Sequence, residues 1–330
     1  MRHGWRFGLY AFLGLWLAMP AMAAPLRAED QARLQALSAS LQIPLDQLTD
    51  AVDQAQPLQP VLDAINRPWE AKPWYQYRAL FLTPERIQAG ARFWRDHADW
   101  LAFAQRRLHV PAEVILAIMG VETFYGTRMG NYPVLDALYT LGFLYPPRAD
   151  YFSREFARYV RLAQQQGWDL RSPKGSYAGA MGMGQFMPTS YLTWAQDFDG
   201  DGHKDLFSNA ADAIGSVGFY LADHGWQENS PVALPARIDD PAGVAALIDD
   251  KPDLTQTWQQ LQAAGVHLSQ TLPANTPVKL LRFQQAEGEE YWVACQNFYV
   301  ITRYNRSPLY AMAVFQLSQE LYRAYHALLR

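Results

Sequence analysis

Prolines that open runs of helical periodicity divide this chain of 330 residues into many short helices. Thr83-Pro84-Glu85 combines a hydroxyl cap, a proline at the first helical position and an acid in the first turn, and the apolar period that follows runs to about residue 108. Val110-Pro111-Ala112-Glu113 begins another helix in the same way, and Ser307-Pro308 begins a last one that reaches about residue 329. The pattern predicts a mostly helical protein.

A smaller part of the chain has strand character. Apolar residues recur at three and four between residues 28 and 66, and helical stretches are also predicted over 150–166 and 212–224. By contrast, Val278-Lys-Leu-Leu-Arg-Phe283 and Tyr291-Trp-Val-Ala294 flank Glu287-Gly288 and predict a β-hairpin. We therefore expect an α+β protein that is mainly α.

Charge and the N-terminus indicate the partners and the location. A net charge of −4 disfavours nucleic acid as a partner. Arg2 and Arg6 precede an uncharged run that ends in the small-x-small pattern Ala21-Met22-Ala23, so residues 1–23 are predicted to be a signal peptide. The single cysteine, Cys295, lies far from this cleavage site and is expected to be a buried apolar residue. We expect a soluble periplasmic protein with no transmembrane segment and no lipid anchor.

Glu122 is the residue best placed for acid–base chemistry. It lies four residues after Ile118 and seven after Ile115, so a helix continuing from Pro111 puts its carboxylate on the apolar face. Burial raises the pKa of a carboxyl group until it holds a proton near neutrality, as a general acid must. The alternative is a structural glutamate that is paired with a buried arginine or bonded to main-chain donors. Glu113, in the first turn, complements the helix dipole and is assigned no chemistry.

A glycine-dense loop spans residues 175–184. Its glycines allow a ligand or a second segment to approach the backbone closely, and Gln185 supplies an amide that both donates and accepts, as sugar hydroxyls and acetamido groups require. The glycine spacing matches neither of the known phosphate-binding loops. The segment therefore indicates a polysaccharide groove, with a tightly packed structural loop as the alternative.

The acidic segment 197–205 has the spacing of a calcium loop. Acids stand at its positions one, three and five, a glycine at six and a histidine at seven. Position twelve is a serine instead of the usual glutamate, and an aspartate four residues further on is expected to close the coordination. The alternative is an acidic loop of Asx turns without an ion. The ligands predicted for a structural Ca²⁺ that braces a loop near the groove are Asp197, Asp199, Asp201, His203 and Asp212.

Together these motifs resemble, in sequence order, those of the lytic murein transglycosylase B family. They are Val121-Glu-Thr-Phe-Tyr-Gly126, the loop Ser176–Gly182 with Gln185-Phe-Met-Pro188, the calcium-like loop, and Ile301-Thr-Arg-Tyr304-Asn305 with Tyr310-Ala-Met-Ala313. The resemblance implies a lysozyme-like catalytic core with an added helical subdomain and a small β-containing subdomain. The segments expected after the signal peptide are a helical subdomain (24–109), the core with the calcium loop (110–230), a small α/β insertion (231–300) and a C-terminal helix completing the core and groove (301–330).

The resemblance also implies the reaction. The substrate would be peptidoglycan, cleaved at the β-1,4 bond between N-acetylmuramic acid and N-acetylglucosamine with formation of 1,6-anhydromuramoyl ends. Glu122 would be the single acid/base, with no cofactor for the chemistry, although the sequence alone equally allows water to attack. The matching groove positions are Ser176, Gln185, Tyr304 and Asn305, and the less diagnostic lining positions are Arg148, Tyr220 and Tyr310.

Two departures from the family pattern bear on location and specificity. Ala24-Pro25 stands where membrane-bound members carry a lipidated cysteine, so the chain resembles a soluble relative. Pro147-Arg148 stands where the family often has paired arginines, which affects one contact to the acidic peptide stem or lactyl group. No motif specifies partners among cell-wall synthesis or hydrolase proteins.

Two other functions stay open at this stage. A hydrolytic muramidase would need a second carboxylate, for which Asp136 is the best candidate. A calcium-stabilised peptidoglycan-binding protein would bind without turnover.

Overall fold

A computed structural model describes residues 27–67, 72–249 and 251–330, so the predicted signal peptide lies outside the described residues. The α-helices of the described part are α1 (Ala28–Leu41), α2 (Leu45–Gln54), α3 (Gln59–Ile65), α4 (Trp74–Phe81), α5 (Pro84–Asp96), α6 (Ala98–Leu108), α7 (Ala112–Thr123), α8 (Val134–Leu144), α9 (Ala149–Gln166), α10 (Pro188–Trp194), α11 (Ala210–Asp223), α12 (Trp258–Ala263), α13 (Gln296–Tyr304) and α14 (Pro308–Leu328). The strands are β1 (Tyr132–Pro133), β2 (Lys174–Gly175), β3 (Ala233–Ile238), β4 (Gln256–Thr257), β5 (Val266–Leu268), β6 (Pro277–Gln284) and β7 (Glu289–Ala294), and the two short 3₁₀ turns are η1 (Pro146–Arg148) and η2 (Ala245–Leu247).

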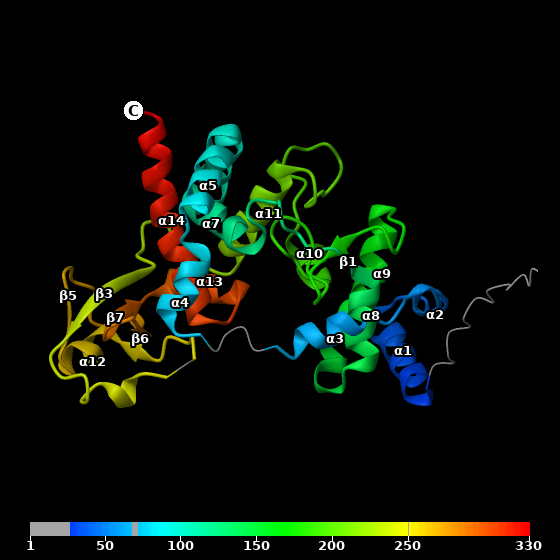
Figure 1. Ribbon diagram of the computed structural model, residues 1–330, viewed down its shortest axis with the longest axis horizontal. Helices are drawn as coiled ribbons and strands as arrows, with labels where there is room; N and C mark the ends of the chain where they lie inside the picture. Colours follow the sequence, from blue (N-terminus) through cyan, green and yellow to red (C-terminus); the bar gives the residue numbers. More distant parts are fainter. Residues whose placement is uncertain (1–26, 68–71, 250) are drawn as a thin grey trace, which may run out of the picture.

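Helix α7 lies at the centre of the main hydrophobic core. Nine of its twelve residues are buried, and it packs against α5, α6, α11 and α14. A helix that is apolar on nearly every face has to be surrounded by other elements. The last described helix, α14, begins at the predicted Ser307 cap and lies alongside α5 and α7 in Figure 1.

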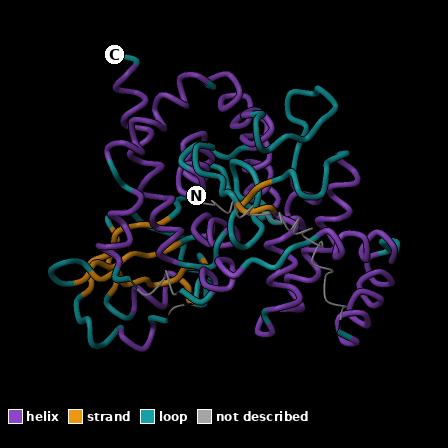
Figure 2. Tube along the Cα trace, turned by 45° about the vertical axis from the view of Figure 1, so that its right-hand side comes forward, coloured by secondary structure: helices purple, strands orange, loops and turns teal. Residues whose placement is uncertain are grey.

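One face of the small sheet forms a second hydrophobic core, and its other face contributes to the main core. Its antiparallel order is β4-β6-β7-β3-β5, and the predicted hairpin is the β6–β7 pair. Alternate side chains of a strand point to opposite faces. Accordingly, Val278 and Leu280 of β6 lie in the sheet's own core with Cys295, whereas Leu281 and Phe283 join the main core. Figure 2 shows these strands grouped at one side of a largely helical chain, which confirms the expected α+β class.

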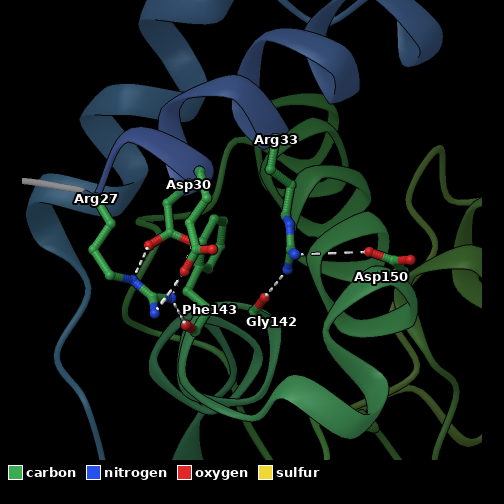
Figure 3. Close-up of polar contacts among 7 residues, drawn as sticks. Arg27, Asp30, Arg33, Gly142, Phe143 and Asp150 are labelled. Atoms are coloured by element: carbon green, nitrogen blue, oxygen red, sulfur yellow. Dashed lines mark hydrogen bonds and ion pairs between the residues drawn. The ribbon is translucent and has the colours of Figure 1, made fainter.

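The N-terminal helices dock on the end of α8 through arginine side chains (Figure 3). An Arg27 Nη donates to the carbonyl of Phe143 at 2.8 Å, and one of Arg33 donates to the carbonyl of Gly142 at 2.9 Å. These carbonyls lie in the last turn of α8, where main-chain acceptors lack partners within the helix. Arg33 also lies 3.8 Å from the Asp150 carboxylate at the start of α9.

The structure corrects one expectation and adds detail to the small α/β insertion. The stretch from Pro84 to Leu108 is two helices, because His97 has φ −125° and ψ 27° and separates α5, which packs on α14, from α6, which packs on α11. Helix α13 begins at Gln296, near the end of the segment 231–300 expected to be a small α/β insertion. The sheet also contains β3, β4 and β5, which are too short or too irregular for the period-two pattern to have revealed them. Within the described ranges, no helix has both the length and the apolar character needed to cross a membrane.

Candidate functional site

Glu122 lies in the last turn of α7 with its carboxylate facing a cavity. The Tyr310 hydroxyl of α14 donates to Glu122 Oε1 at 2.6 Å, across 188 positions of sequence. Burial raises the pKa of Glu122 to about 7, and the tyrosine bond opposes that change by stabilising the ionised form. Glu122 therefore has a tyrosine as its hydrogen-bond partner. Among the described residues it forms neither an ion pair with an arginine nor a hydrogen bond to a main-chain donor, as a structural glutamate would. The group can hold or release a proton near neutrality.

The backbone after Glu122 turns sharply and is held in place by side chains. Phe124 and Tyr125 both have positive φ, at 52° and 58°. The Tyr125 hydroxyl donates to the carbonyl of Arg86 at 3.0 Å. A Cβ on Gly120 would come within 2.7 Å of that hydroxyl, so a larger residue at position 120 would displace the Tyr125 ring.

Thr123 joins the end of α7 to the glycine-dense loop. Its hydroxyl donates to the carbonyl of Met183 at 2.7 Å and accepts from the main-chain N–H of Gly126 at 2.8 Å. Thr123 stands in the motif Val121–Gly126, but a lone threonine carries no sequence pattern that would predict this role. It fixes the distance between the carboxylate and the opposite wall of the cavity.

Polar side chains in and next to the glycine-dense loop form hydrogen bonds to main-chain groups of the protein. Ser176 Oγ accepts from the N–H groups of Ala178 at 3.3 Å and Ala180 at 3.1 Å. Gln185 Nε2 donates to the carbonyls of Met129 and Gly182, both at 3.1 Å. Since both amide hydrogens are used within the protein, Gln185 offers the cavity an acceptor, and the expectation that it would also donate to a sugar is wrong for this conformation.

Tyr304 closes the wall next to this loop. Its hydroxyl donates to the carbonyl of Gly184 at 2.5 Å. A Cβ on Gly184 would lie 2.9 Å from that hydroxyl and 3.0 Å from Val217. Tyr220 packs edge-on against Tyr304 with ring centroids 4.8 Å apart, and its own hydroxyl donates to the carbonyl of Arg303 at 2.6 Å. The aromatic wall therefore has its hydroxyls fixed by main-chain acceptors.

These residues line one cavity of about 360 Å³, which we call the groove. Six predicted site residues line it: Glu122, Ser176, Gln185, Tyr220, Tyr304 and Asn305. Tyr310 contacts Glu122 directly and is itself buried. Arg148 is placed elsewhere. It lines a cavity of about 580 Å³ together with Arg27 and Arg33, and its guanidinium stacks 4.8 Å from the ring centre of Tyr151.

The acidic loop brings together three of the five predicted calcium ligands. Carboxylate oxygens of Asp197, Asp199 and Asp212 lie within 4.8 Å of one another. Asp212 closes the cluster from α11, as the spacing predicted, and its buried carboxylate also accepts from the N–H of Phe198 at 2.7 Å. Asp201 and His203 are not part of this cluster. Clustered carboxylate oxygens are the ligands that Ca²⁺ prefers, so the donor set fits the ion.

The acidic loop also contacts the groove wall. The main-chain N–H of Met183 donates to the carbonyl of Leu206 at 2.8 Å. A Cβ on Gly182 would lie 2.5 Å from the same carbonyl, so the two loops pack backbone to backbone. The acidic loop therefore supports the backbone of the loop that carries Gln185.

The sequence of this chain matches a known protein family. Residues 27–319 match the family described as "Transglycosylase SLT domain". The chain belongs to this family. The resemblance to the lytic murein transglycosylase B family is also confirmed, since the chain is 45% identical over 246 residues to "Membrane-bound lytic murein transglycosylase B" of Escherichia coli (strain K12). That alignment covers 74% of this chain and 66% of the relative.

Solved structures of this transglycosylase family share the fold. The "Catenated Lytic Transglycosylase SltB1" of Pseudomonas aeruginosa matches with a TM-score of 0.86 and 44% identity, covering 91% of this chain and 98% of that one. The E. coli lytic transglycosylase Slt35, solved in complex with calcium, matches with a TM-score of 0.81 and 39% identity, covering 91% and 94%. SltB3 of P. aeruginosa, solved in complex with NAG-anhNAM-pentapeptide, matches with a TM-score of 0.76 and 28% identity, covering 89% and 79%.

Proposed function

We propose that this member of the transglycosylase SLT domain family is a lytic murein transglycosylase. It cleaves the β-1,4 bond between N-acetylmuramic acid and N-acetylglucosamine and leaves 1,6-anhydromuramoyl ends. The observation that carries the proposal is Glu122, whose pKa of about 7 belongs to the one acidic side chain among the described residues that line the groove. The relatives' names support the substrate, and the anhydro sugar bound to SltB3 supports the form of the product.

In the first step Glu122 acts as the general acid. It protonates the glycosidic oxygen while the bond from that oxygen to C1 of the muramoyl residue breaks, and N-acetylglucosamine leaves with a new 4-hydroxyl. As that bond breaks, the carbonyl oxygen of the substrate's own acetamido group forms a bond to C1 and takes up the developing positive charge as an oxazolinium ion. A second enzyme carboxylate is therefore not needed for this step.

In the second step Glu122 acts as the general base. As a carboxylate it takes the proton from the 6-hydroxyl of the muramoyl residue, and that oxygen attacks C1 to close the 1,6-anhydro ring. The acetamido oxygen leaves C1 in the same step. The proton that Glu122 gave to the leaving group is thereby replaced, and no water is consumed. The Tyr310 hydroxyl, 2.6 Å from Oε1, stabilises the ionised intermediate form of the acid.

The polar groups of the groove orient the muramoyl residue for ring closure. The acceptor of Gln185 faces sugar hydroxyl or acetamido N–H groups, and Ser176 and Asn305 provide further polar atoms around the same cavity. Asn305 Oδ1 accepts from the N–H of Ser307 at 3.1 Å, which leaves its amide hydrogens for the ligand. Tyr220 and Tyr304 supply rigid aromatic surface for a sugar face.

The hydrolytic alternative lacks support from its best candidate residue. Asp136 is 1% exposed. Its carboxylate pairs with Arg171 at 2.9 Å and accepts from the N–H of Gln56 at 2.9 Å. Both oxygens are therefore used in holding the N-terminal helices to α8 and the loop before β2. A protein that only binds peptidoglycan would gain nothing from Glu122, whose burial disfavours the ionised carboxylate.

We also propose that Ca²⁺ binds at the Asp197, Asp199 and Asp212 cluster as a structural ion, with Asp201 and His203 completing the shell. The complex of Slt35 with calcium supports this assignment. The ion neutralises three clustered carboxylates and stiffens the loop whose Leu206 carbonyl contacts the groove wall. The chemistry itself uses no cofactor.

We propose the cellular location and the domain organisation of the protein on the same grounds. The protein acts on peptidoglycan in the periplasm, as a soluble product of signal-peptide cleavage after residue 23. Its segments are the helical subdomain 24–109, the core 110–230, the insertion 231–300 and the C-terminal segment 301–330. Arg148 contacts an acidic part of the substrate from its own cavity beside η1, outside the groove.

Mass spectrometry of muropeptides released from purified peptidoglycan by the mature protein tests the reaction. The expected fragments are one water lighter than hydrolytic fragments and absent with Glu122→Gln. Glu113→Gln is the matched control, because Glu113 lies on the same helix and burial also raises its pKa. Fragments with ordinary reducing ends would make the protein a muramidase, and a folded protein that binds strands without releasing fragments would support the binding alternative.

A further inference from the structure

Arg86 of α5 is an arginine that is buried without an acidic partner. It is 8% exposed, and in the part of the chain that the structure describes it forms no ion pair. One Nη donates to the carbonyl of Leu80 at 2.5 Å, whereas Nε has no hydrogen-bond partner among the described residues. An apolar side chain would fill this position at a lower cost of desolvation, so the guanidinium has to be explained by what it contacts.

The guanidinium of Arg86 contacts the turn that follows α7. Its central carbon lies 5.2 Å from the ring centre of Phe124 and 5.2 Å from that of Phe81. The main-chain carbonyl of the same arginine accepts from the Tyr125 hydroxyl at 3.0 Å. Arg128 also lies over the Phe124 ring, at 4.8 Å, but its side chain is exposed. Arg86 therefore contacts both aromatic residues of the turn from the protein interior.

This turn has a backbone conformation that bulky residues rarely adopt. Phe124, Tyr125 and Gly126 have φ values of 52°, 58° and 85°, so three consecutive residues lie in the left-handed region. Glycine adopts this conformation without steric cost, whereas an aromatic residue stays there only where its surroundings hold it. The turn starts two residues after Glu122, so the contacts that hold it also set where α7 ends and how the carboxylate is directed.

The Tyr125 ring lies between glycines of two helices. A Cβ on Gly90 of α5 would lie 2.3 Å from the Tyr125 hydroxyl, and a Cβ on Gly120 of α7 would lie 2.7 Å from it. Neither helix could carry a larger residue at these positions without displacing the ring. Since the hydroxyl is bonded to the Arg86 carbonyl, the ring ties α5 to the end of α7.

We infer that Arg86 is a positioning residue for Glu122. The inference rests on the proposed function, in which Glu122 gives a proton to one oxygen and takes a proton from another. Arg86 is not among the described residues that line the groove, so it acts through Phe124 and Tyr125 and not on the sugar. A displacement of about 1 Å in a reacting group can cost about a hundredfold in rate. Loosening the turn should therefore slow the reaction and leave substrate binding unchanged.

The first variant is Arg86→Met, which removes the charge and the donors and keeps an unbranched side chain. With soluble glycan strands as substrate, we expect kcat per folded molecule to fall about tenfold to a hundredfold, with KM within about twofold of wild type. Arg86→Lys, which keeps a cation beside both rings, should recover most of kcat. Arg92→Met is the matched control, because Arg92 is an exposed arginine of the same helix, and it should behave as wild type.

NMR titration of the Glu122 carboxyl group gives a readout that needs no substrate. Burial raises the pKa of this group to about 7 in wild type, and a loosened turn admits water to it. The pKa should therefore fall in Arg86→Met and stay unchanged in Arg92→Met. Tyr125→Phe keeps the ring and removes the bond to the Arg86 carbonyl. It replaces Arg86→Met if that variant fails to fold, and it should lower kcat and the pKa of Glu122 in the same way.

The outcomes separate the inference from the proposed function. A lower melting temperature of Arg86→Met with wild-type kcat and an unmoved pKa of Glu122 would overturn the inference, because Arg86 would then only stabilise the fold. A raised KM with unchanged kcat would also overturn it, because Arg86 would then act on substrate binding. If wild type releases fragments with ordinary reducing ends, or none, the proposed function fails, and the NMR titration still decides whether Arg86 positions the carboxyl group.

Discussion

Replacing Glu122 with glutamine should change the stability of the protein in a way that depends on pH. The folded chain raises the pKa of this carboxyl group to about 7 from an ordinary value of 4.5. The folded protein therefore binds more protons than the unfolded chain between these two values, and its stability falls as pH rises through that window. Glutamine keeps an oxygen that can accept from Tyr310 and cannot ionise, so the variant avoids this loss.

The magnitude follows from the two pKa values. A tenfold change in proton affinity corresponds to about 1.4 kcal/mol, so a pKa of about 7 against 4.5 makes ionised Glu122 cost about 3 kcal/mol in the folded state. The variant should thus exceed wild type in stability by about 3 kcal/mol at pH 8.5 and by less than about 1 kcal/mol at pH 4.5. The difference should grow between these pH values and become constant above about pH 8.

Urea denaturation of the mature proteins at several pH values measures this difference. Glu287→Gln is the control, since Glu287 is exposed in the turn of the β6–β7 hairpin and its substitution should give a difference near zero at every pH. A stability difference between Glu122→Gln and wild type that is the same at pH 4.5 and 8.5 would refute the reasoning. In that case folding would not disfavour the ionised carboxylate, and the argument that a raised pKa makes Glu122 a general acid would fail.

Three further predictions concern the groove, the acidic loop and the second carboxylate. Tyr310→Phe removes the donor 2.6 Å from Glu122, so the pKa of the acid should rise and the alkaline limb of the pH–rate profile should move to higher pH; an unmoved limb contradicts this. Added Ca²⁺ should raise the melting temperature of wild type but not of Asp212→Asn, as measured by calorimetry, and an equal response of both proteins argues against the site. Asp136→Asn should lower stability by about 1 kcal/mol by weakening the contact to the partly exposed Arg171, while turnover per folded molecule stays unchanged; loss of turnover would reveal a second catalytic carboxylate.

The features that sequence predicted well are those fixed by local chemistry. The Thr83 and Ser307 caps start α5 and α14 where expected, because a hydroxyl followed by proline specifies a helix start without tertiary help. The β6–β7 hairpin follows from two apolar runs around Glu287-Gly288, and Gly288 adopts the positive φ, 77°, that such a turn uses. Glu122 is half-buried, as expected for a carboxylate on a helix that is largely apolar.

The features that sequence missed depend on distant parts of the chain. No local pattern predicts that a helix ends at His97, where α5, which packs on α14, is followed by α6, which packs on α11. Likewise, nothing near Glu122 identifies Tyr310 as its hydrogen-bond partner, because the two lie on different helices. The engagement of both Gln185 amide hydrogens by carbonyls also required the folded backbone.

The position of Tyr310 links the small sheet to the acid. Trp292 of β7 packs edge-on against Phe315 of α14 with ring centroids 6.2 Å apart, and Phe283 of β6 packs on Trp74 of α4 at 5.2 Å. Phe315 lies little more than one helical turn after Tyr310, so the sheet supports the part of α14 that carries the hydroxyl. The sheet has its own core on one face and contributes to the main core on the other. Its inward face therefore helps to hold the Tyr310 hydroxyl that stabilises ionised Glu122, although none of the described groove residues comes from the sheet.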